Sequence, residues 1–106
     1  MLSFPFFYGE GIMANAFFGT DWNLDTTGVI VTYPVKIKSI KVIAEAALGG
    51  ENILIHDPVT GGLLFEEVCP GSNFTSQELI EKVWPNGFTL TSLGGIAGAH
   101  ILVSLG

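Results

Sequence analysis

Turn-forming residues recur at intervals of roughly ten positions along this chain, and the runs between them are rich in β-branched and aromatic residues. The run 28–34 ends at Pro34, and the run 88–93 lies between two glycine-containing segments. β-Branched and aromatic side chains fit the pleated surface of a sheet, whereas Gly, Pro, Asn and Asp form tight turns. The spacing therefore predicts an all-β fold, either a small antiparallel β-sandwich of jelly-roll type or a barrel.

Length and apolar content allow one small domain with a core of its own. The chain has 106 residues, of which 48% are hydrophobic and 14 are glycine. A chain of this size buries most of the surface that it exposes when unfolded, so one domain is expected. We assign residues 26–106 to the β-sandwich domain and residues 1–25 to an extended apolar arm at the N-terminal end.

The run 35–46 alternates between apolar and polar residues, and this alternation changes phase within the run. The apolar phase that includes Ile37 is replaced by another that begins at Ile40. A one-residue change of phase in a strand predicts a β-bulge, here near Ser39. Three lysines of this run are then expected to face solvent: Lys36, Lys38 and Lys41.

His56 and Asp57 are adjacent, and such a pair raises the question of a catalytic or metal site. They stand where the run 53–56 meets the segment 57–62, which contains a proline and two adjacent glycines. Asp-Pro followed by Gly-Gly is typical of a turn in which the Asp side chain binds the loop backbone. We therefore interpret the pair as the turn of a hairpin between residues 53–56 and 63–68.

The secondary structure of residues 69–84 is left open by the sequence. Thr75 followed by Glu78 resembles the capping box that begins a helix. Residues 79–84 also alternate as in a strand. Periodicity over so few residues does not decide between a helix and a strand.

Charge and composition argue against two classes of partner. The net charge is −6, with four lysines and no arginine. Nucleic-acid binding needs clustered cations against the phosphates, so we expect no nucleic acid as a partner. No run approaches the ~20 apolar residues of a membrane-spanning helix, so we expect no membrane partner.

The candidate residues for catalysis or metal binding each have a simpler interpretation. Cys69 is the only cysteine, so it forms no internal disulfide and cannot alone build a zinc site. Glu66 and Glu67 are adjacent, which places them on opposite faces of a strand. The segment DWNLD (21–25) resembles a calcium loop, but it lacks the glycine and the distal glutamate of such a loop. We predict a protein that is not an enzyme, with no catalytic site, no bound metal and no cofactor.

Three segments of the chain share a pattern with a known group of proteins. They are TTGVIVTYPVKIKSIKVIA (26–44), GGENILIHDPVTGGLLFEEV (49–68) and WPNGFTLTSLGGIAGAHILVSLG (84–106). In this order they resemble the small all-β virion proteins of tailed bacteriophages, which include capsid decoration or cement proteins. The resemblance covers residues 26–106, and it brings no catalytic residues with it.

The resemblance implies a decoration protein on the capsid surface of a virion. Its partners would be the major capsid protein and copies of itself, in a homo-oligomer such as a trimer. An apolar arm and free strand edges suit contacts between subunits. The expected interface residues are Phe4, Phe6, Phe7, Tyr8, Phe17, Phe18 and Trp22 as apolar anchors, and Lys36, Lys38 and Lys41 as polar contacts to an acidic neighbour.

The aromatic residues also allow a function of another class. Trp22, Tyr33 and Trp84 could form a platform on which sugar rings stack. The alternative function is therefore a carbohydrate-binding β-sandwich module of a phage tail or fibre, with Trp22 or Trp84 as the platform. Packing in a core or an interface is the simpler interpretation of the same residues, since large aromatic side chains dominate both.

Overall fold

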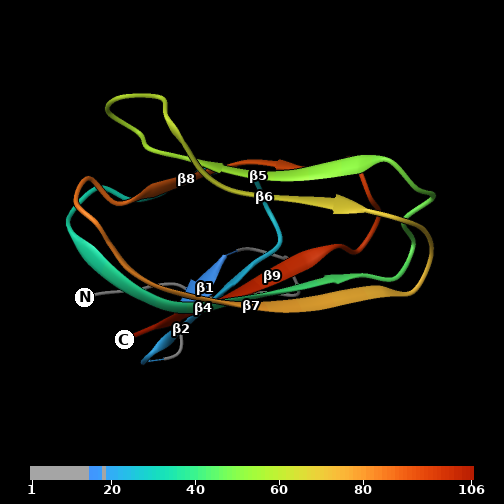
Figure 1. Ribbon diagram of the computed structural model, residues 1–106, viewed down its shortest axis with the longest axis horizontal. Coiled ribbons are helices and arrows are strands. Elements are labelled where there is room, and N and C mark those ends of the chain that lie inside the picture. The colour runs from blue at the N-terminus through green and yellow to red at the C-terminus, as the bar shows by residue number, and fades with distance from the viewer. Residues whose placement is uncertain (1–14, 18) are drawn as a thin grey trace.

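The computed structural model describes residues 15–17 and 19–106 of the chain. These residues form nine strands in two antiparallel sheets that face each other, as Figure 1 shows. The strands are β1 (Ala16–Phe17), β2 (Asp21–Leu24), β3 (Gly28–Val31), β4 (Val35–Ala44), β5 (Glu51–His56), β6 (Leu63–Cys69), β7 (Phe74–Trp84), β8 (Phe88–Leu93) and β9 (His100–Leu105). The predicted all-β sandwich is confirmed.

The order of the strands is that of a jelly roll. One sheet runs β1-β2-β9-β4-β7 and the other runs β3-β8-β5-β6. The strands pair in a nested order: β5 pairs with β6, β4 with β7, β3 with β8 and β2 with β9. Each strand of the second half of the chain therefore lies antiparallel to one strand of the first half. Two four-stranded sheets wound in this way define the jelly roll, to which β1 adds a short fifth strand.

The core lies between the two sheets and follows the alternation of the strands. In β4, Ile37, Ile40 and Val42 are fully buried, while the three lysines of the strand are exposed. The pairing of β4 with both of its neighbours shifts register between Ile37 and Ser39. This confirms the bulge that the sequence predicted, and the bulge keeps apolar residues on the inner face over ten positions.

Most of the ambiguous segment is a strand, because residues 74–84 form β7. β7 pairs with β4 from Val35↔Trp84 to Ala44↔Phe74, with a register shift in between. Glu81 has a positive φ of 50° within this strand, which marks an irregularity on β7 as well. Pairing with β4 along its whole length makes this segment a strand. The local periodicity alone could not decide this.

Among the described residues, β1 and β2 fall within residues 1–25, which the sequence analysis assigned to the arm. β2 pairs with β9 from Asp21↔Ser104 to Leu24↔Ile101, and Leu24 is fully buried. The five-stranded sheet therefore begins before residue 26, because β2 directs an apolar residue into the core like the strands after it. Over the described part of the chain, no helix is long and apolar enough to cross a membrane.

Candidate functional site

The sequence analysis preferred packing to a sugar platform as the role of the large aromatic residues, and Trp84 packs in the core. Trp84 is 3% exposed, and its ring packs edge-on against Phe88 with a centroid distance of 5.5 Å. A ring buried in this way cannot stack on a sugar, so the platform role that the alternative gave to Trp84 is wrong. Trp22 is half-buried and lies against Phe17 with a centroid distance of 4.8 Å, and Phe17 is 44% exposed.

Part of the predicted interface lies outside the described residues. Phe4, Phe6, Phe7, Tyr8 and Phe18 all fall in that part of the chain. The described anchors are Phe17 and Trp22, which stand next to each other on β1 and β2.

The three predicted lysine contacts lie on the outer face of the five-stranded sheet. Lys36 is opposite Val83 of β7, and Lys41 is flanked by Gln77 of β7 and Leu102 of β9. Lys36 and Lys38 also border a shallow cavity of about 360 Å³ together with Glu81 and Gly106. The structure thus brings these lysines together in one exposed row.

Exposed aliphatic side chains accompany this row of lysines. Leu79 is 66% exposed and Val83 is 59% exposed, both on β7 next to β4. We call the surface formed by Lys36, Lys38, Lys41, Leu79 and Val83 the outer face. Exposed aliphatic side chains gathered on one face make that face a candidate protein-binding surface.

One edge of each sheet lies on the same side of the sandwich. β6 ends one sheet and β7 ends the other, and the Ser76 hydroxyl donates a hydrogen bond of 3.1 Å to Glu67 across the gap. Glu78 and Lys82 stand opposite Ile40 and Ile37 of β4, which are buried. Charges on the inner side of an edge strand, together with a bulge, protect it against addition of another strand. Contacts through the side chains of the outer face are therefore favoured over strand addition.

Asp57 has the structural role that the sequence predicted. Its carboxylate accepts hydrogen bonds from the backbone N–H groups of Val59 at 2.8 Å and Thr60 at 3.0 Å, and from the Asn86 side chain at 3.1 Å. It thereby ties the β5–β6 loop, which projects from the four-stranded sheet in Figure 1, to the turn before β8. The neighbouring His56 ring makes a hydrogen bond of 2.7 Å with the Thr91 hydroxyl instead.

These hydrogen bonds make stability depend on pH. The N–H groups of Thr60 and Val59 hold the pKa of Asp57 below its ordinary value of 3.8. A carboxyl group with a lowered folded-state pKa stabilises the fold above its unfolded pKa, and this contribution is lost as the pH falls through the folded value. We expect the melting temperature of Asp57→Ala to fall below that of the wild type at pH 7, and the difference to shrink below about pH 4. Thermal melts at both pH values measure this, and a difference that stays constant with pH would contradict the role of the carboxylate.

Cys69 and His56 do not form a common site. Cys69 is fully buried, and burial, followed by the carboxylates of Glu51 and Glu67, raises the pKa of its thiol. It pairs with Glu51 at one end of β5, whereas His56 lies at the other end, about 17 Å away along the strand. A buried thiol with a raised pKa is a poor nucleophile and metal ligand.

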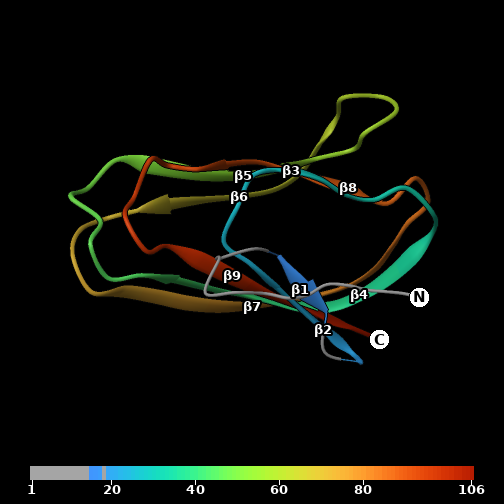
Figure 2. The same ribbon diagram turned by 180° about the vertical axis from the view of Figure 1, so that it is seen from behind.

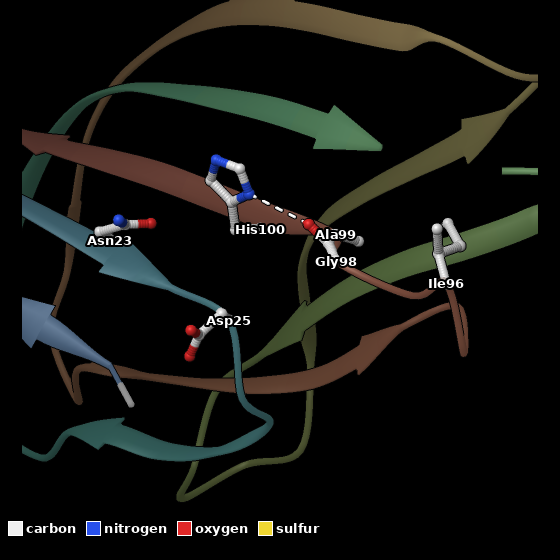
Figure 3. Close-up of a pocket in the computed structure, with 6 residues that line it drawn as sticks. All are labelled: Asn23, Asp25, Ile96, Gly98, Ala99 and His100. Carbon is white, nitrogen blue, oxygen red and sulfur yellow. Dashed lines mark hydrogen bonds between the residues drawn. The ribbon is translucent and has the colours of Figure 1, made fainter. Parts of the chain in front are cut away.

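A pocket that the sequence analysis did not identify lies where β2 ends and β9 begins. Its volume is about 290 Å³, and Figure 3 shows its lining residues. We call it the β2–β9 pocket, formed by Asn23, Asp25, Ile96, Gly98, Ala99 and His100. Within the described residues, no group of three His, Cys, Asp or Glu side chains is placed to hold a metal ion.

Comparisons with known proteins do not place the chain in a family. No family model, curated protein or solved structure matches it. The function must therefore be inferred from the residues and their geometry.

Proposed function

We propose that this chain is a structural subunit of a bacteriophage virion, a capsid decoration or cement protein that stabilises the head lattice by protein–protein contacts. It acts on the capsid surface as a homo-oligomer and contacts the major capsid protein. The role is not catalytic, and it uses the outer face and the anchors Phe17 and Trp22 as contact surfaces.

The outer face is the observation that carries this proposal. It presents Leu79 and Val83, each more than half exposed, beside the row of three lysines on β4. Exposed aliphatic groups lose contact with water when a partner covers them, and the lysines match an acidic surface. The chain itself carries a net charge of −6, so the remaining surface of another copy is such a partner.

The fold supports the proposal by analogy. Jelly rolls occur among viral capsid domains and among lectins, so the topology fits both the main proposal and the carbohydrate-binding alternative. Burial of Trp84 removes one of the two platforms on which the alternative depended. Trp22 is the platform that it retains.

Charged residues on the outer face are expected to break the association of subunits. In the double variant Leu79→Asp/Val83→Asp, burial of two carboxylates opposes docking, and we expect self-association to weaken at least tenfold. Sedimentation equilibrium over a range of concentrations measures the effect. The matched control is Val29→Asp/Val68→Asp in the four-stranded sheet, whose valines are 60% and 51% exposed. An equal effect of both double variants, or a wild type that stays monomeric at every concentration, would contradict the use of the outer face.

A reconstruction of the particle tests the virion role itself. We expect the chain in many symmetric copies on the head, with the outer face covered by a neighbouring subunit. A glycan array tests the alternative, and sugar binding that is lost in Trp22→Ala with the fold intact would overturn the capsid proposal.

A further inference from the structure

The β2–β9 pocket contains a buried hydrogen-bond acceptor without a donor. The Oδ1 atom of Asn23 is shielded from solvent, and no donor among the described residues reaches it. A buried acceptor left in this state destabilises a protein, and native structures rarely keep one without a reason. Figure 3 shows this oxygen turned toward the side of the pocket where Asp25 and His100 lie.

Asp25 and His100 supply two further acceptors. The pairing of β2 with β9 ends at Leu24↔Ile101, so Asp25, which follows β2, and His100, which begins β9, lie at the same end of the strand pair and both line the pocket. One oxygen of the Asp25 carboxylate accepts a hydrogen bond of 3.0 Å from the Thr26 hydroxyl. The second oxygen of the carboxylate takes no part in the contacts found among the described residues.

The protonation of the neutral His100 ring follows from its own hydrogen bond. Its Nδ1 atom lies 3.2 Å from the carbonyl oxygen of Gly98, and a carbonyl oxygen can only accept. Nδ1 therefore carries the proton, and in the neutral ring Nε2 is left as an acceptor. Gly98 holds its carbonyl in place through a turn with a φ of 73°.

We propose that the β2–β9 pocket binds an alkyl guanidinium or ammonium group, supplied by an arginine or lysine side chain or by a free amine. Such a cation has several donors for the oxygens of Asn23 and Asp25 and for the His100 ring. Its aliphatic stem can lie against Ile96 and Ala99, as the stems of basic side chains commonly do on apolar surface.

Size and ligand number distinguish this occupant from others. A volume of about 290 Å³ has room for the end of one basic side chain and lies at the lower bound for small-molecule sites. A divalent metal takes four or more ligands, whereas only Asp25 and His100 are ionisable ligands in this pocket. The inference does not rest on the proposed virion role, because it concerns the pocket alone.

Titration of the full-length protein with n-butylguanidinium, followed by ¹⁵N-¹H correlation spectra, tests the proposal. We expect saturable shifts at the amides of residues 23–25 and 98–100, and none that saturate with n-butylurea, which has the same shape but no charge. Asp25→Asn should weaken binding about tenfold, because a charge-assisted hydrogen bond is lost. Asp21→Asn removes the same charge at the other end of β2, outside the pocket, and should leave the affinity within about twofold of the wild type.

A second variant distinguishes the loss of a ligand contact from the loss of the folded structure. Asn23→Leu removes the unpartnered acceptor at similar volume, so we expect it to abolish binding and to raise the melting temperature by about 4 °C or more. Equal affinity for n-butylurea, equal effects of Asp25→Asn and Asp21→Asn, or wild-type binding by Asn23→Leu would each overturn the proposal. Weaker self-association of Asp25→Asn would identify a lysine of a second copy as the cation, and unchanged self-association with lost guanidinium binding would identify an external one.

Discussion

Replacement of Gly87 by alanine is expected to lower the free energy of unfolding by about 3 kcal/mol or more. Gly87 lies in the turn between β7 and β8 with a φ of 79°, a conformation that L-residues avoid. A Cβ atom at this position would overlap the carbonyl oxygen of Val31 and lie 3.0 Å from the backbone nitrogen of Thr32. Backbone atoms of a neighbouring strand end cannot move aside as a flexible side chain can, so the turn itself must shift.

Gly95→Ala is the matched control for this prediction. Gly95 has a φ of 69°, yet no heavy atom lies within 4 Å of the position that its Cβ would take. We expect a loss of about 1 kcal/mol there, because only the conformational cost applies. Urea unfolding curves with an unchanged m-value measure both losses. Similar losses for the two variants would show that crowding against Val31 has no effect.

Gly87 also illustrates which parts of the fold the sequence can predict. The Pro-Asn-Gly segment at residues 85–87 marks a turn by its composition alone, and the structure has a turn there. The close approach of Gly87 to Val31 depends on the pairing of β3 with β8, which are distant in sequence. Local patterns therefore locate the turn but not the steric reason for its glycine.

The alternation of residues was informative where one face of a strand is buried. It located the bulge near Ser39 and the exposure of the lysines of β4, because the core requires apolar residues on one side. It failed for β7, since most residues of this edge strand are at least partly exposed and carry no clear period. It also placed the start of the sandwich after β2, a strand too short to give a periodic signal.

The β2–β9 pocket could not be found from local patterns. Asn23 and Asp25 stand near one end of the chain and His100 near the other, and only the pairing of β2 with β9 joins them. The available signal was the alternation of polar residues in 21–25, which we interpreted only as a weak calcium motif. Pairing this segment with the run 100–105, which also alternates, would have placed Asp25 beside His100.

Replacement of Trp84 by alanine is expected to lower the free energy of unfolding by about 3–5 kcal/mol, which is the usual effect of removing a large buried ring. The side chain is 3% exposed and packs edge-on against Phe88, which is fully buried. Thermal unfolding followed by circular dichroism should show a melting temperature lower by more than about 10 °C. Trp84→Phe keeps an aromatic ring in the core and should lose much less stability.

This result decides how a test of sugar binding must be designed. Loss of glycan binding in Trp84→Ala would follow from an unstable fold as readily as from a lost platform, so it would not identify a binding site. Trp22 is half-buried and packs both against Phe17 and against the edge of the core, so Trp22→Ala removes a ring that a ligand could contact and should cost less stability than Trp84→Ala. A Trp84→Ala protein that keeps its melting temperature would show that this ring does not pack in the core, and would restore it as a candidate platform.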